Sequence, residues 1–183
     1  MSAAMATATS DNKTEASAAS EAVTTQQAWE AVAAASFAVV AYATPAGEPR
    51  SSGVVYKTVG SRLYLAVAPD SWKAKHIAAR GEVSVTVPIP RGGVLALVLP
   101  IPPATVSFHA TAKVHPAGSP EARWALKELG SLLPPERRDT GSIVEVIPEG
   151  TFLTYGLGVS LSEMRNPVAA GARVPVMSPS NPR

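Results

Sequence analysis

The sequence predicts a mostly β, α+β domain: a small antiparallel β-barrel with flanking helices. Three observations lead to this prediction. Apolar, β-branched segments alternate with Pro/Gly turns between residues 37 and 88, as in a meander of strands. A short helical segment then precedes another alternating strand, and more strands follow nearer the C-terminus. Finally, 183 residues with 46% apolar content suffice for one domain with its own core.

Seven segments of the sequence have the composition or the alternation of strands. The first is continuously apolar, as expected of a buried strand, and the fourth and fifth alternate polar with apolar residues. The last two are closing segments, separated by the Pro148-Glu149-Gly150 bend. The seven segments are residues 37–44, 50–59, 62–68, 82–87, 104–114, 142–147 and 151–157.

Three helices are predicted, at residues 24–35, 71–80 and 119–129. Thr25 is a candidate N-cap of the first helix, in which we expect Trp29 to be a core anchor. Ser119, followed by proline and glutamate, caps the third helix, in which Trp124 and Leu126 are candidate core residues.

These elements define the expected domain organisation. Residues 1–21 are rich in Ala, Ser and Thr, which predicts a disordered segment. The barrel domain is expected to span residues 22–165, and residues 166–183, rich in Pro, Gly and small side chains, read as a flexible tail.

An unusually long apolar connection, residues 88–103, joins two of the expected strands, where hairpin loops normally take 2–5 residues. One interpretation is an extra strand or a lid packed on the barrel or on a partner subunit. The other is an apolar mouth for a substrate, or a weak membrane or lipid contact, made by Val94, Leu95, Leu97 and Leu99. The segment is too short to span a bilayer.

Composition excludes several classes of function. The net charge is only +2 and no run of Lys or Arg occurs, so no nucleic-acid partner is expected. The absence of cysteine removes disulfides, thiolate chemistry and Cys-based metal sites. No metal site is expected, because His109 and His115 lie six residues apart with no nearby carboxylate. The N-terminus lacks a secretory pattern, and we expect a cytoplasmic location, with membrane association as the alternative.

The start of the second helix is a candidate anion site. Ser71 offers a hydroxyl at a helix N-terminus, where backbone N–H groups are free, and Lys73 and Lys75 follow closely. The alternative is an ordinary capped surface helix with solvated lysines.

The segment Ser71-Trp72-Lys73-Ala74-Lys75-His76-Ile77 resembles the Ser-Arg-Lys-Ala-x-x-Ile element of the pyridoxamine-phosphate-oxidase-like superfamily, which holds a cofactor phosphate. The resemblance covers roughly residues 29–158. It implies a six-stranded antiparallel split β-barrel that forms a homodimer and binds flavin mononucleotide (FMN) or the deazaflavin coenzyme F-420. The implied function is an oxidoreductase acting on a small, apolar organic substrate.

The resemblance also implies which residues face the cofactor. On the second strand these are Ser51, Ser52, Val54 and Tyr56, and at the helix start they are Ser71, Trp72, Lys73 and Lys75. Ser51 and Tyr56 occupy positions where the oxidases carry a phosphate-binding Arg and Lys. The alternative function is therefore a non-catalytic split-barrel protein that binds a cofactor, a lipid or a tetrapyrrole-like ligand. No catalytic residue is identified.

Overall fold

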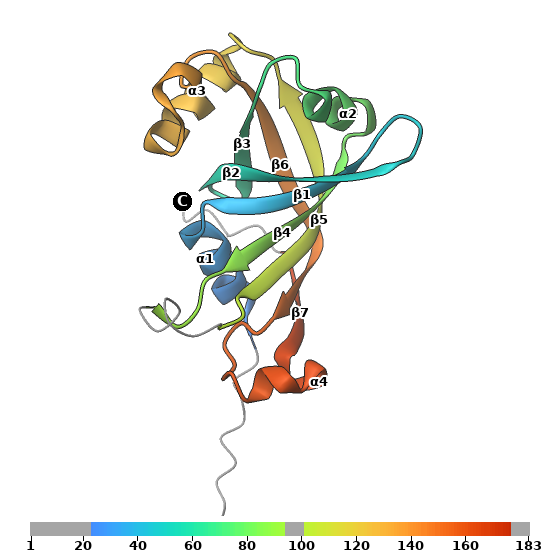
Figure 1. Cartoon of the computed structure of the whole chain (residues 1–183), viewed down its shortest axis with the longest axis vertical. Helices are drawn as coiled ribbons and strands as arrows, with labels where there is room; N and C mark the ends of the chain where they lie inside the picture. The colour runs from blue at the N-terminus through green and yellow to red at the C-terminus, as the bar shows by residue number, and fades with distance from the viewer. Residues whose placement is uncertain (1–22, 94–100, 177–183) are drawn as a thin grey trace, which may run out of the picture.

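The computed structural model describes residues 23–93 and 101–176. Its strands are arranged as one antiparallel sheet that curls into a barrel (Figure 1). They are β1 (Phe37–Ala43), β2 (Pro49–Val59), β3 (Arg62–Val67), β4 (Glu82–Ile89), β5 (Ala104–His115), β6 (Ser142–Tyr155) and β7 (Gly171–Pro175).

The barrel closes through a pairing between strands that are far apart in sequence. The sheet order is β3-β2-β1-β4-β5-β6-β7, and the additional pairing of β3 with β6 joins the two sides. In that pairing Leu63 lies opposite Val146 and Val67 opposite Ser142. The predicted six-stranded antiparallel barrel is thereby confirmed, with β7 as an extra strand.

The last barrel strand is continuous, whereas the sequence predicts two strands separated by a bend at residues 148–150. β6 runs through the bend because β5 pairs with it on both sides of a register shift at Ser107 and His109. Residues 150–152 of β6 lie opposite the single residue Phe108, which accommodates the extra length as a bulge. The first half of β6 pairs with β3 and the second half with β7.

Four α-helices lie in the described part of the chain. They are α1 (Thr25–Ala34), α2 (Trp72–Arg80), α3 (Pro120–Leu129) and α4 (Pro167–Ala170). The N-cap of α1 is Thr24 rather than the predicted Thr25, since Thr24 and Gln27 form a reciprocal capping box. The predicted caps of α2 and α3 are confirmed: the hydroxyls of Ser71 and Ser119 accept hydrogen bonds from Ala74 N–H and Ala122 N–H.

An aromatic cluster lies at the centre of the barrel core. Phe152 of β6 is fully buried, and its ring meets those of Trp29 and Phe108 edge-on, with centroids 5.1 and 5.3 Å away. Trp29 is thus the core anchor that the sequence predicts. Trp124 is not: it is 43% exposed and meets Tyr64 at the surface, whereas Leu126, also on α3, is buried.

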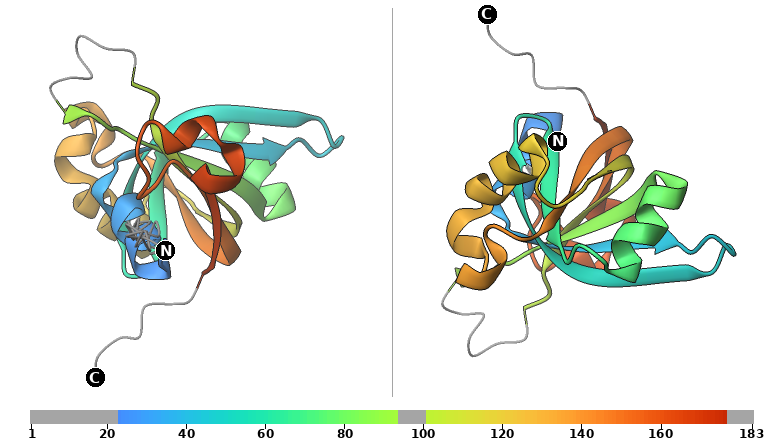
Figure 2. Two further views of the ribbon diagram at one scale, coloured as in Figure 1. Left: turned by 90° about the horizontal axis from the view of Figure 1, so that it is seen from below. Right: turned by 90° about the horizontal axis from the view of Figure 1, so that it is seen from above.

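Two helices flank the part of the barrel where the candidate site lies. The buried face of α3 packs on the outer side of β2 and β3. Helix α2 lies beside the long β1–β2 hairpin, which projects from the barrel in Figures 1 and 2. Arg80 of α2 donates a 3.1 Å hydrogen bond to the carbonyl oxygen of Pro45 in the hairpin turn. This bond fixes the end of α2 against the hairpin.

The predicted C-terminal tail is structured through residue 176. Residues 167–170 form α4, and β7 then pairs with β6, with Val174 opposite Phe152. The apolar residues Val94, Leu95, Leu97 and Leu99 lie outside the described residues, as does the N-terminal segment 1–21. None of the described helices has the length and apolar character needed to cross a membrane.

Candidate functional site

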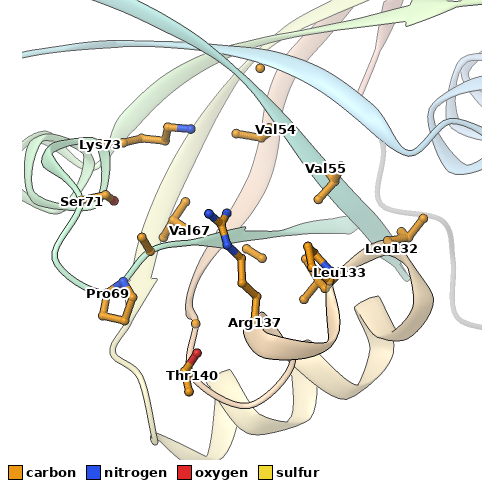
Figure 3. A pocket seen from close by; sticks show the side chains of 15 residues that line it. Val54, Val55, Val67, Pro69, Ser71, Lys73, Leu132, Leu133, Arg137 and Thr140 are labelled. Atoms are coloured by element: carbon orange, nitrogen blue, oxygen red, sulfur yellow. The ribbon is translucent and has the colours of Figure 1, made fainter.

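A cavity of about 550 Å³ lies over β2 and β3, between the start of α2 and the loop that follows α3 (Figure 3). Its volume is in the range of small-molecule and cofactor sites. Most of its wall is apolar or backbone. The residues that line it are Gly53, Val54, Val55, Ala66, Val67, Ala68, Pro69, Ser71, Lys73, Leu132, Leu133, Pro134, Arg137, Thr140 and Gly141.

One end of the cavity is formed by the N-terminus of α2. The turn after β3 brings Ser71 to the cavity, and its hydroxyl caps the helix by accepting from Ala74 N–H at 3.2 Å. The first backbone N–H groups of a helix carry a partial positive charge and lack intrahelical acceptors. This end of the cavity therefore suits an anion.

Lys73 adds a full positive charge to the same end. Its side chain is half-buried, and burial lowers the pKa of its ammonium below the ordinary value. Within residues 23–93 and 101–176 no carboxylate forms an ion pair with it. An anionic ligand in the cavity would provide the missing counter-charge.

The opposite wall is a loop that the sequence analysis left without a role. It consists of two short 3₁₀ helices, Gly130–Leu132 and Pro135–Arg137, between α3 and β6. Leu133 is buried against α3, and Leu132, Leu133 and Arg137 all line the cavity (Figure 3). The guanidinium of Arg137 reaches into the space between the loop and Lys73.

Of the predicted cofactor-binding residues, Val54, Ser71 and Lys73 line the cavity. Tyr56 does not: its ring is fully buried in the barrel core, where its hydroxyl donates a 2.5 Å hydrogen bond to the Val32 carbonyl oxygen. Burial also raises the pKa of this hydroxyl above its ordinary value. Ser52 lies on the same face of β2 as Tyr56, with a buried hydroxyl, and Ser51 is exposed outside the cavity lining.

Trp72 and Lys75 also lie outside the cavity lining, on the surface of α2. Trp72 is 73% exposed, and the ammonium nitrogen of Lys75 lies 5.2 Å from its ring centroid, in a cation–π arrangement. Trp72 and Lys75 are three residues apart and share one face of α2, whereas Lys73 projects from another face and reaches the cavity together with the N-cap residue Ser71.

The sequence analysis missed the residues that complete the cavity from the loop after α3, chiefly Leu132, Leu133, Arg137 and Thr140. The local signal there is a pair of prolines followed by two arginines, which reads as the end of a helix and a polar turn. Whether this loop lies against β3 depends on where α3 packs, and the local sequence pattern does not reveal that. Ala66 and Val67 of β3 also line the cavity.

The described part of the cavity lining offers no acid–base pair. Among its described residues the charged side chains are Lys73 and Arg137, both cations, and the hydroxyls belong to Ser71 and Thr140. No group of three His, Asp or Glu residues in the described ranges could hold a metal ion. The arrangement suits a ligand with a flat or apolar body and an anionic end, and any chemistry would come from that ligand.

A second polar cluster lies on the barrel wall outside the cavity lining, with His115 and Glu145 buried and Arg62 partly exposed. The Glu145 carboxylate of β6 accepts a 2.8 Å hydrogen bond from His115 Nε2–H, and it also forms an ion pair with Arg62. Burial acts to raise the pKa of the Glu145 carboxyl, but the bonds to His115 and Arg62 outweigh it and hold the pKa below its ordinary value of 4.5. The cluster joins β3, β5 and β6, and we assign it a structural role.

The Glu145 cluster predicts a loss of stability in acid. A carboxyl group whose pKa is lower in the folded state than in the unfolded state stabilises the fold. This contribution is fully present at pH values above the pKa of the unfolded state, and it is lost as the pH falls through the pKa of the folded state. We expect the free energy of unfolding of the wild type to decrease as the pH falls below 4.5. Glu145→Gln should be less stable at pH 7 and should show a smaller decrease in acid. Urea unfolding of the wild type and of Glu145→Gln between pH 3 and 7 measures these free energies. If stability depended on pH equally in the two proteins, the structural role of the Glu145 cluster would be contradicted.

Comparisons with known proteins find similarity in structure only. No protein-family model matches the sequence, and no curated protein matches it. Among solved structures, the heme storage protein HutZ from Vibrio cholerae is 14% identical, with a TM-score of 0.55 over 73% of this chain and 92% of that chain. A heme-binding protein from Mycobacterium smegmatis is 16% identical, with a TM-score of 0.57 over 83% of this chain and 57% of that chain. A candidate pyridoxamine 5'-phosphate oxidase from Listeria innocua is 13% identical, with a TM-score of 0.51 over 68% of this chain and 93% of that chain.

Proposed function

The chain has the split-barrel fold of the pyridoxamine-phosphate-oxidase-like proteins, and from this premise we propose that its cavity binds a phosphate-bearing flavin or deazaflavin coenzyme. The protein would then act as an oxidoreductase that passes a hydride between the coenzyme and a small organic substrate. FMN and coenzyme F-420 are the candidate cofactors.

The observation that carries this proposal is the composition of the cavity wall. Its cationic end combines the Ser71 hydroxyl, the N-terminus of α2 and the half-buried ammonium of Lys73. The rest is largely aliphatic, from Val54, Val67 and neighbouring residues. A coenzyme with a planar apolar ring system and a phosphate group matches both parts, because phosphates bind at helix N-termini and ring systems bind against apolar walls.

The absence of an acid–base pair in the lining is compatible with this function. In flavin and deazaflavin enzymes the hydride chemistry is supplied by the bound cofactor. The chain's own residues would position the ring against β2 and β3, exclude water from it and neutralise the phosphate.

The second candidate is a protein that binds its ligand without catalysis. Two of the structural neighbours are named as heme proteins, so heme deserves a separate test. Heme iron is held by His, Cys, Met or Tyr side chains, and none of these is among the described residues that line the cavity. This observation favours a flavin or deazaflavin over an iron-ligated heme at this cavity.

The test is the absorption spectrum of the purified full-length protein, followed by titration with FMN, coenzyme F-420 and heme. Binding of FMN or F-420 is expected, with tighter binding than that of heme. Anaerobic reduction of the bound coenzyme, followed by exposure to organic acceptors, distinguishes an oxidoreductase from a storage protein: reoxidation by an acceptor supports the enzyme. Tighter binding of heme than of either coenzyme would contradict the proposal.

The proposal includes a homodimer. On the outer side of the barrel, Phe37, Val39 and Leu153 are 47%, 37% and 41% exposed. The strand register places Val39, Thr86, Ser107 and Leu153 in one row across β1, β4, β5 and β6. A second copy of the chain would bury this apolar face, and closed two-fold dimers are the commonest assembly of soluble proteins.

We therefore expect sedimentation to give a mass near twice 18.9 kDa at micromolar concentration. Val39→Arg should shift the protein to the monomer, because it places a charge in the middle of the apolar face. Val168→Arg is the matched control, since Val168 is 87% exposed on α4 and is not a member of this row. A monomeric wild type over a wide concentration range would contradict the dimer.

A further inference from the structure

Arg137 differs from most other arginines of the described chain in having no protein partner for its side chain. Its guanidinium makes no hydrogen bond or ion pair within residues 23–93 and 101–176, and it points into the cavity in Figure 3. Six other arginines in these ranges donate side-chain hydrogen bonds to protein acceptors: Arg50, Arg62, Arg80, Arg91, Arg123 and Arg138.

The backbone that carries Arg137 is held firmly in place. Its own N–H donates a 2.9 Å hydrogen bond to the Pro134 carbonyl oxygen, and Arg138 Nε donates to the Leu133 carbonyl oxygen at 3.1 Å. Gly141 allows the loop to approach β3 closely: a Cβ there would lie 3.1 Å from Leu126 Cδ2 and 3.6 Å from the Val67 carbonyl oxygen. Arg137 itself is exposed, and these contacts place its guanidinium at the mouth of the cavity.

Lys73 and Arg137 face the cavity from opposite walls, and no carboxylate is among the described lining residues. Two cations without a counter-charge repel each other, so the arrangement gains most from a ligand that carries two negative charges. The Ser71 hydroxyl accepts from Ala74 N–H and keeps its own hydrogen for donation to a ligand, whereas the Thr140 hydroxyl donates to the Glu136 carbonyl oxygen at 3.1 Å.

We infer that Arg137 and Lys73 together bind one phosphate monoester, and that the loop after α3 selects ligands with this group. The inference rests on the proposed function and deepens it. A monoester carries about −1.5 to −2 charges at pH 7 and three acceptor oxygens, which a guanidinium fork and an ammonium can share. A phosphate diester carries a single charge. The cavity should therefore prefer FMN, a monoester, to coenzyme F-420, a diester, and to riboflavin, which has no phosphate.

The test is titration of the full-length protein with FMN, riboflavin and F-420, in the wild type and in Arg137→Ala. We expect the wild type to bind FMN more tightly than the other two. Arg137→Ala should weaken FMN binding by about ten- to a hundredfold, the usual loss for a charge-assisted contact, and leave riboflavin binding within about twofold. The affinity of Arg137→Lys for FMN should lie between those of the wild type and Arg137→Ala, since lysine keeps the positive charge but lacks the paired N–H donors of the guanidinium.

Two controls make the result specific. Lys127→Ala removes an exposed cation of α3 that lies outside the cavity lining, and it should leave FMN binding unchanged. The double variant Lys73→Ala/Arg137→Ala tests whether the two cations share one phosphate, because shared contacts give losses that are not additive. Additive losses would show that they bind different groups and would overturn the shared phosphate.

The outcomes separate this inference from the proposed function. Flavin binding with the same FMN-to-riboflavin ratio in the wild type and Arg137→Ala would overturn the inference alone. Tight binding of F-420 with weak binding of FMN would also overturn the inference, but it would support the proposed function. A wild type that binds neither flavin nor F-420 would overturn both.

Discussion

Replacing Phe152 by alanine is expected to lower the free energy of unfolding by about 3–5 kcal/mol, the usual range for a buried phenylalanine. The ring is fully buried and makes edge-on contacts with both Trp29 and Phe108. Its removal would leave a cavity where α1 meets β5 and β6, and the barrel wall cannot collapse into that space without breaking the pairing of β6 with its neighbours. Urea or thermal unfolding followed by circular dichroism measures the loss.

Thr151→Ala is the matched control for Phe152→Ala, because Thr151 precedes Phe152 on β6 and its side chain is exposed. This change should alter the free energy of unfolding by about 0.5 kcal/mol or less. If Phe152→Ala were no more destabilising than Thr151→Ala, the aromatic cluster would not be the centre of the core.

Lys73→Ala is expected to weaken binding of FMN or F-420 by about tenfold to a hundredfold, equivalent to about 1.5–3 kcal/mol for a charge-assisted contact. The ammonium is half-buried at the cavity, and within the described residues no carboxylate pairs with it. Fluorescence titration at low and high salt measures the effect, which should be smaller at high salt, where the charge is screened. Ser71→Ala should cost less, since the backbone N–H groups of α2 remain.

Lys57→Ala controls for a general loss of positive charge, because Lys57 is exposed on β2 and lies outside the cavity lining. It should leave the dissociation constants unchanged. If the wild type and Lys73→Ala bound each coenzyme equally well, the proposed anion site at α2 would be contradicted. The main support for the proposed cofactor would be lost with it.

Local pattern was sufficient to predict most of the barrel. Alternation in residues 82–87 and 104–114 places their apolar side chains on one face, and in β4 and β5 these side chains are buried. Ser71 and Ser119 were identifiable as helix caps because the signal is local: a short hydroxyl side chain followed by a helical segment. The position of Lys73 in the first turn of the helix that Ser71 caps followed from the same short segment.

Other features depended on contacts between segments distant in sequence. A strand pattern does not reveal its partners, so the pairing of β3 with β6 that closes the barrel, and the use of β7 as an extra strand, required the whole structure. Tyr56 illustrates the limit for site residues: the resemblance placed it at the cofactor, while the barrel places its ring in the core, bonded to Val32 of α1.

The sequence by itself determined the barrel class, the helix caps and one cationic end of the cavity, because these depend on the spacing of residues within single segments. Only the tertiary structure decided that the loop after α3 forms the opposite wall. That outcome depends on the packing of α3 against β2 and β3 and on the close approach that Gly141 permits. The same packing brings Arg137 to the cavity that Lys73 faces, although the two residues are far apart in the chain and no local pattern links them.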